Sequence, residues 1–127
     1  MRKTSRSENI AMPSILRIPH DCSHETRTPV APERLVAGQP THASANAYSS
    51  ADMAFHCGVW EGDVGAWRVQ YTEHELCHML QGRVRIVGDD GSETTVAAGD
   101  SFVIPAGFSG IWDVIEPARK LYAVYEI

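Results

Sequence analysis

The sequence predicts an all-β fold, a sandwich or jelly-roll barrel built as a single domain. From Met53 onward, short runs of β-branched and aromatic residues are separated by turn signals about every 8–12 residues. No stretch keeps a long 3.6-residue period, and no internal repeat is evident. The 127 residues fit one domain, long enough to bury roughly two-thirds of the surface of the unfolded chain.

Three regions are expected along the chain: a flexible tail over residues 1–28, an extended arm over 29–52 and the barrel over 53–127. The tail and the arm are rich in proline and small or polar residues, a composition typical of loops and extended chain. Strands are expected at 54–60, 65–71, 75–80, 82–88, 92–96, 101–104, 109–115 and 119–126. Asp89-Asp90-Gly91 is the best hairpin signal, and Glu116-Pro117-Ala118 predicts a later turn.

The composition excludes several function classes. The net charge of −5 argues against non-specific nucleic-acid binding, which needs a basic surface to displace phosphate counterions. No apolar run approaches the ~20 residues that span a bilayer, and the polar start lacks the apolar core of a signal peptide. Cys22, Cys57 and Cys77 are an odd number without a pairing pattern, as expected of reduced thiols. We therefore expect a cytoplasmic protein that binds neither nucleic acid nor membranes.

The predicted strand 75–80 has two mixed faces. Alternation places Glu75, Cys77 and Met79 on one face and Leu76, His78 and Leu80 on the other. Neither face is fully polar, so one should line the barrel interior and the other should be covered by the N-terminal segment or by a second subunit. Because apolar patches on small proteins usually mark interfaces, a homodimer is expected.

Two glycine-bounded segments, residues 62–82 and 99–110, carry a motif pattern. Their spacing resembles the two signature motifs of the cupin superfamily, G-x5-H-x-H-x4-E-x6-G and G-x5-P-x-G-x2-H. The matching positions are Gly62, Glu75, Gly82, Gly99, Pro105 and Gly107. The three histidine positions are held instead by Arg68, Gln70 and Gly110. Gly82 and Gly107 would allow tight turns between strands, and Pro105 would end a strand.

A narrower resemblance covers roughly residues 33–127. It rests on the phrases Gly58-Val-Trp-Glu61, Glu75-Leu-Cys-His-Met-Leu-Gln-Gly82, Gly99-Asp-Ser-Phe-Val-Ile-Pro-Ala-Gly-Phe108 and Trp112-Asp-Val-Ile-Glu-Pro117. They are similar to a cupin subfamily that includes the (S)-ureidoglycine aminohydrolase cupin domain and the ethanolamine-utilisation cupins. The resemblance implies an RmlC-like cupin jelly-roll barrel that associates as a dimer. It implies no particular reaction, because the fold hosts many functions.

The resemblance also implies where a metal would bind. A typical cupin site uses three imidazoles and a carboxylate, of which only Glu75 is present here. The Arg68 guanidinium has no lone pair to donate, and Gly110 offers only its backbone. We expect no bound metal; a transition metal, if present, would be held by Glu75 with Gln70.

Two arrangements of charged and metal-ligating residues stay open. In the first, Arg68 and Glu75 form a buried salt bridge inside the barrel. In the second, side chains outside the motif positions regroup around Glu75 to hold a metal: His56, His74, Cys77 and His78. Alternation opposes the second, because His74 and His78 should point away from the Glu75 face.

The hypotheses about function follow from the replacement of the three metal-binding histidines. Counting by twos from Gly110 places Trp112 on the interior face, where an aromatic wall and a few polar groups would form a small-molecule pocket. The expected ligand-binding residues are Arg68, Gln70, Glu75, Cys77 and Trp112. The first hypothesis is a small-molecule-binding cupin with a degenerate metal site. The alternative is a metal-dependent, aminohydrolase-like enzyme for a ureido or amino acid substrate, with Glu75 as metal ligand or general base.

Overall fold

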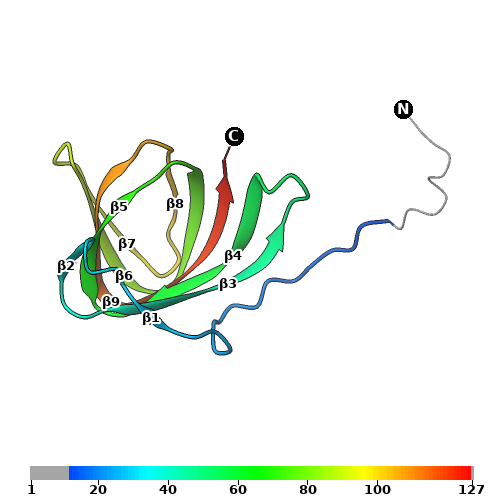
Figure 1. The fold of residues 1–127 in the computed structure, drawn as a ribbon, viewed down its shortest axis with the longest axis horizontal. Helices are drawn as coiled ribbons and strands as arrows, with labels where there is room; N and C mark the ends of the chain where they lie inside the picture. The colour runs from blue at the N-terminus through cyan, green and yellow to red at the C-terminus, as the bar shows by residue number, and fades with distance from the viewer. Residues whose placement is uncertain (1–11, 127) are drawn as a thin grey trace.

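The structure, a computed structural model, describes residues 12–126, and within them it contains strands and turns but no helix. The strands are β1 (Thr28–Pro29), β2 (Leu35–Ala37), β3 (Thr41–Ser49), β4 (Phe55–Gly62), β5 (Gly65–Gln70), β6 (His74–Gly88), β7 (Glu93–Ala97), β8 (Ser101–Ile104) and β9 (Ser109–Tyr125). All strand pairings are antiparallel, and the sheet curls into an open barrel (Figure 1). The predicted all-β fold is confirmed. No helix that could cross a membrane occurs over residues 12–126.

Two long strands connect the two halves of the barrel. β6 and β9 pair along their whole length, from His74 opposite Tyr125 to Gly88 opposite Gly110. The first half of β6 also pairs with β8, and its second half pairs with β7. Similarly, β9 pairs with β5 before its midpoint and with β4 after it. Each long strand therefore belongs to both halves of the barrel.

Both long strands bend where they cross from one half to the other. The register shifts between Met79 and Val84, beside Pro117 and Ala118 on β9. Gly82 lies in this bend with a φ of +88°, and a Cβ there would be 2.2 Å from the carbonyl oxygen of Pro117. The sequence predicted turns at Gly82 and at Glu116–Ala118. Both predictions are wrong, because the two irregular segments lie against each other and the ladder resumes beyond them.

The segment before the predicted barrel contributes to the sheet. β3 pairs with β4 over nearly its full length, from His42 opposite Gly62 to Ser49 opposite His56. Upstream of it, Cys22 is buried in a small cluster with Ala43 and Val59. Residues 1–11 of the predicted tail lie outside the described part of the chain. Ile18 packs against the Cys22 cluster, and residues 12–17 run away from the barrel as extended chain (Figure 1).

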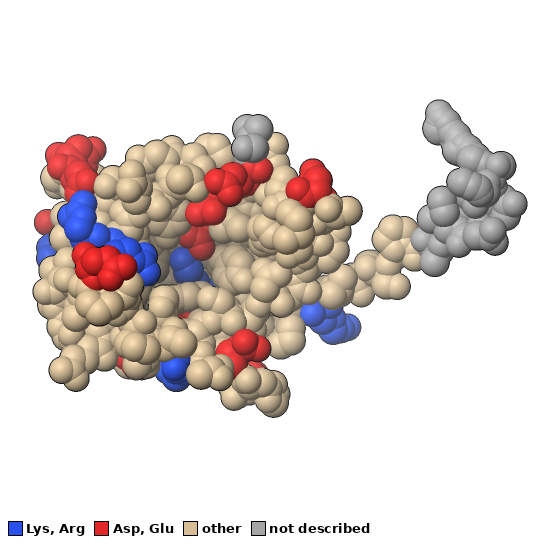
Figure 2. Space-filling view, in the orientation of Figure 1, with Lys and Arg blue, Asp and Glu red and all other residues tan. Residues whose placement is uncertain are grey.

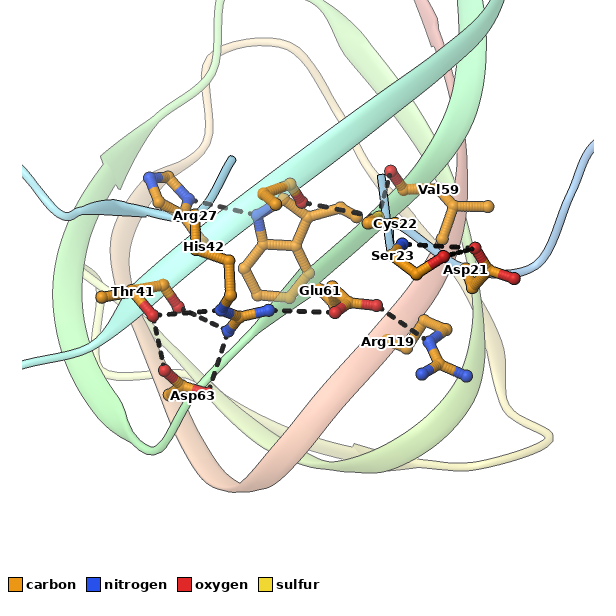
Figure 3. A network of polar contacts seen from close by, with 12 residues as sticks. Asp21, Cys22, Ser23, Arg27, Thr41, His42, Val59, Glu61, Asp63 and Arg119 are labelled. Carbon is orange, nitrogen blue, oxygen red and sulfur yellow. Dashed lines mark hydrogen bonds and ion pairs between the residues drawn. The ribbon is translucent and has the colours of Figure 1, made fainter. Parts of the chain in front are cut away.

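A polar network ties this N-terminal region to the barrel (Figure 3). The Arg27 guanidinium bonds Glu61 and Asp63, both at 2.9 Å, and also donates to Thr41. Arg119 of β9 approaches the other oxygen of Glu61 at 3.2 Å. The network links the chain before β1 to β3, β4 and β9. None of these contacts involves a residue before Asp21.

Candidate ligand-binding cavity

A cavity of about 320 Å³ opens between the two halves of the barrel. In Figure 2 the face toward the viewer is hollowed, and acidic and basic atoms lie together there. The lining residues come mainly from β3, β4, β5, β6 and β9: Arg34, His42, Ser44, Trp60, Trp67, Val69, Gln70, Tyr71, Glu73, Glu75, Trp112, Lys120, Tyr122 and Val124. This volume is at the small end of the range for small-molecule sites.

All three tryptophans of the chain line this cavity. The ring of Trp60 lies 6.1 Å from that of Trp67 and 6.0 Å, edge to face, from that of Trp112. Trp67 and Trp112 stand directly opposite each other on β5 and β9, so their side chains share the inner face. The result is a three-sided aromatic wall.

His42 completes one side of the wall. The Trp60 indole Nε1–H donates to His42 Nδ1 at 3.2 Å, so this nitrogen is unprotonated. Burial lowers the pKa of His42, and the cationic Arg34 and Arg27 lower it further. His42 is therefore a neutral imidazole at neutral pH.

A buried ion pair forms the floor. Lys120 Nζ lies 3.0 Å from Glu75 Oε2, and both side chains are only 7% exposed. The ammonium also lies 4.5 Å from the centroid of Trp112 and 5.4 Å from that of Trp60, within cation–π range. Burial alone would lower the pKa of Lys120, but Glu75 and Cys77 outweigh it and the pKa is raised. The ammonium therefore stays charged, and the cavity floor carries it paired with the Glu75 carboxylate.

Two neighbours of the pair are held neutral. Burial raises the pKa of the Cys77 thiol to about 12, even though Lys120 acts in the opposite direction. Burial, with the charge of Glu75 next, also raises the pKa of the Tyr71 phenol. The Cys77 sulfur lies 3.6 Å from Lys120 Nζ and packs behind it, so Cys77 backs the floor and does not line the cavity. A thiol with so high a pKa is a poor nucleophile.

Trp112 supplies the one unpaired donor among the buried side chains of the described residues. It is 2% exposed, and its indole N–H has no hydrogen-bond partner. Buried donors are nearly always satisfied by protein, water or ligand. The nitrogen itself has almost no accessible surface, so it is not open to a molecule in the cavity. The predicted interior position of Trp112 is confirmed, and its role in binding stays a prediction.

Arg68 does not take the place that the sequence predicted. It binds Asp89 through two contacts of 2.8 and 3.0 Å, and its side chain is 47% exposed. Because Trp67 occupies the inner face of β5, its neighbour Arg68 points outward. The predicted Arg68–Glu75 salt bridge is wrong, and the true partner is Lys120, which sequence reasoning missed. Gln70, near the end of β5, still reaches the cavity lining.

Comparison with known proteins places this geometry in a family. Residues 49–122 match the EutQ-like cupin domain. The chain belongs to that family. A DUF861-family protein of unknown function from Pseudomonas syringae pv. tomato is 27% identical, with a TM-score of 0.71 over 79% of this chain and 43% of that one. The chain thus spans less than half the length of this relative.

Other solved structures share the EutQ-like cupin fold. A DUF861-family protein from Thermotoga maritima is 34% identical, with a TM-score of 0.50, over 50% of this chain and 73% of that one. A putative ethanolamine utilisation protein EutQ from Salmonella typhimurium is 16% identical, with a TM-score of 0.60, over 80% of this chain and 94% of that one. The last likeness shows the fold alone. Among curated proteins, none matches the chain.

The residues of this EutQ-like cupin do not fit the metal that many cupins hold. Over residues 12–126, no group of three or more His, Cys, Asp or Glu side chains gathers closely enough for an ion. Glu75, the carboxylate left at the motif position, already contacts the Lys120 ammonium. A metal cation on Glu75 would have to share the carboxylate with that ammonium and bear the repulsion between two positive charges.

The alternative grouping of histidines around Glu75 is wrong. His74 and His78 point outward from β6 and bond the Ala106 N–H and the Ser101 hydroxyl. His56 bonds Ser49 and the carbonyl of Met53. Of the four regrouped side chains, Cys77 alone shares the inner face with Glu75, as alternation predicted. Over the described residues, the positive charge at this floor comes from Lys120.

Proposed function

We propose that this EutQ-like cupin domain binds a small polar organic molecule in its tryptophan-walled cavity, with Lys120 as the charged anchor. The observation that supports this most directly is the burial of the ammonium against Glu75, Trp60 and Trp112. A buried ion pair is a poor source of stability, since desolvating two charges offsets most of their attraction. A binding role explains why such a pair stands at the floor of an open cavity.

The lining indicates the chemistry of the ligand. Arg34 and Lys120 bring positive charge, and Glu73 and Glu75 balance it. The tryptophan rings favour a flat or apolar part, and the Lys120 ammonium favours an acceptor oxygen. A small carboxylate that also carries an amide, amine or ureido group matches both features. The predicted roles of Gln70 and Glu75 are kept in this proposal, Cys77 supports Lys120 from behind, and Arg68 has none.

Titration with small carboxylates, amides and ureido acids is expected to change the tryptophan fluorescence saturably for at least one compound. All three tryptophans report on the cavity, so no label is needed. Lys120→Met should weaken that binding at least about tenfold, the loss expected for one hydrogen bond to a charged group. Trp112→Phe should weaken it as well, because it removes part of the aromatic wall. The fluorescence of the remaining tryptophans and circular dichroism would confirm that each variant is folded.

The control variant is Arg83→Met, which removes a half-exposed arginine of β6 outside the cavity. It should bind like the wild type. No saturable response from any compound, or wild-type affinity in both cavity variants, would contradict the proposal. Release of ammonia from ureidoglycine that depends on added manganese would favour the aminohydrolase-like enzyme instead.

A further inference from the structure

A serine and a histidine outside the cavity lining form a close pair on the β3–β4 hairpin. The Ser49 hydroxyl oxygen lies 2.6 Å from His56 Nδ1, and the two residues stand opposite each other in the sheet. His56 Nε2 lies 2.9 Å from the carbonyl oxygen of Met53. A serine is activated by a base within hydrogen-bond reach when a third group orients that base. The hairpin contains all three parts of this arrangement.

The hydrogen bonds around the pair determine where its protons lie. A carbonyl oxygen only accepts, so His56 Nε2 carries the ring proton, and Nδ1 of the neutral imidazole is free to act as a base. The Tyr122 hydroxyl donates to Asn46 Oδ1 at 2.9 Å. Asn46 Nδ2 in turn donates to Ser49 Oγ at 3.0 Å. The Ser49 hydroxyl therefore directs its own proton to His56 Nδ1.

The pair lies on the inner face of the barrel, at the edge of the cavity. Val124 of β9 lines the cavity and stands opposite His56 of β4, and residues directly opposite each other share a face. Tyr122, which also lines the cavity, connects to Ser49 through Asn46. Ser49 and His56 are both partly exposed. A small molecule in the cavity can therefore extend along β4 and β9 to the serine.

A second serine–histidine pair in the same protein lacks this setting. Ser101 Oγ lies 2.7 Å from His78 Nδ1, nearly the same distance as in the first pair. This pair joins β8 to β6 on the outer face of the barrel, away from the cavity. Over residues 12–126, no hydrogen bond orients the other ring nitrogen of His78. Both pairs are close, but only His56 has a ring that is held in place by a third group.

We propose that Ser49 and His56 form a nucleophilic site that hydrolyses carboxylic esters with a short acyl chain. His56 Nδ1 takes the Ser49 proton as Oγ bonds to the ester carbonyl carbon, and it gives this proton to the alcohol as the ester C–O bond breaks. Water then attacks the acyl group on Ser49, its proton passing through Nδ1 to restore the serine, and the carboxylic acid leaves. One ester and one water are consumed, and one acid and one alcohol are formed.

The cavity beside the pair sets the size of the acyl group. Its volume of about 320 Å³ is small, and the aromatic wall already encloses it on several sides. An acyl chain of a few carbons fits there, and a long chain does not. The reaction uses the hairpin alone, so it does not depend on which ligand the Lys120 end of the cavity binds.

Labelling of the full chain with an alkyl fluorophosphonate, which bonds covalently to activated serines, tests the site. Peptide mass spectrometry is expected to find the adduct on Ser49 and none on Ser101. His56→Gln should slow the labelling at least about 100-fold, a contribution typical of a general base. Ser101→Ala removes the exposed serine of the second pair and should be labelled like the wild type. Circular dichroism would confirm that each variant is folded.

Hydrolysis of p-nitrophenyl acetate and p-nitrophenyl octanoate measures the reaction itself. The acetate should be hydrolysed with saturation, the octanoate at least about tenfold more slowly because its chain exceeds the pocket, and Ser49→Ala should remove both activities. Four results would overturn the proposal: no adduct on Ser49, equal labelling of Ser101, wild-type labelling in His56→Gln, or labelling of Ser49 without hydrolysis of the acetate. An octanoate hydrolysed as fast as the acetate would contradict the proposed acyl length.

Discussion

Lys120→Met and Glu75→Gln are each expected to lower the free energy of unfolding by about 3–5 kcal/mol, whereas the double variant should lose less than either. Removing one partner leaves the other as a buried charge without a counterion, and this is what makes the loss large. In the Glu75→Gln variant, burial of Lys120 is no longer opposed by the carboxylate. The pKa of Lys120 should then fall below its ordinary value.

Urea unfolding at pH 7 of the wild type, both single variants and the double variant measures this coupling. A matched control pair joins the same two strands on the surface: Arg83 and Glu116, 3.4 Å apart and about half exposed. Arg83→Met and Glu116→Gln should each cost less than about 1 kcal/mol, as surface pairs do. Two results would show that the two charges do not depend on each other. One is a loss of unfolding free energy in the single cavity variants as small as in these controls. The other is a loss in the double variant equal to the sum of the two single losses.

Gly82→Ala is expected to be the most damaging small substitution in the bend, at about 3 kcal/mol or more. Two costs add: a left-handed backbone at φ +88°, and a methyl group 2.2 Å from the carbonyl oxygen of Pro117. The obstructing atom belongs to the backbone of β9, so relief would require the two long strands to separate. The bend that lets β6 join both halves of the barrel would then be lost.

Gly91→Ala separates the two costs. Gly91 has a nearly identical φ of +89°, but nothing lies within 4 Å of the point that an alanine methyl group would occupy, so its variant bears the backbone cost alone. That cost is about 1–2 kcal/mol. Thermal and urea unfolding of both variants should place Gly82→Ala at least about 1–2 kcal/mol below Gly91→Ala. Equal losses would mean that the contact with Pro117 does not constrain the strands.

Most of the correct predictions came from the alternation of side chains between the two faces of a strand. It placed Glu75, Cys77 and Met79 inward and Leu76 outward, and it placed Trp112 and Val114 in the interior. The turn signal Asp89-Asp90-Gly91 also lies where β6 turns into β7. These predictions worked because each depends on neighbours within one strand or one turn.

The same rule would have found Lys120 if the strand had been continued. Counting by twos from Trp112 reaches Val114, passes the exposed Glu116 at the bend, and then reaches Ala118 and Lys120, which are buried like Val114. The predicted turn at Glu116–Ala118 broke the count, since proline usually ends a strand. Only the fold shows that Pro117 lies against Gly82 and that β9 continues beyond it. The residues near each bend do not indicate that the two bends contact each other.

The prediction that Arg68 points inward was wrong for a related reason. The motif spacing fixed its position along the chain, but the face of β5 is set by the pairing of Trp67 with Trp112. The place of Cys22 was also beyond local reasoning, because a proline-rich segment gives no sign of the sheet that it covers. Motif spacing therefore identified the family and misplaced the charged partner of Glu75.

The metal content of the purified domain, measured by plasma mass spectrometry without prior chelation, tests most directly whether Lys120 takes the place of a cupin metal. We expect the wild type to hold less than about one-tenth of a transition metal ion per chain, since the ammonium repels a second cation beside Glu75. Only variants in which Lys120 is replaced should bind a metal more tightly than the wild type. One transition metal ion per chain that disappears in Glu75→Gln would contradict the account.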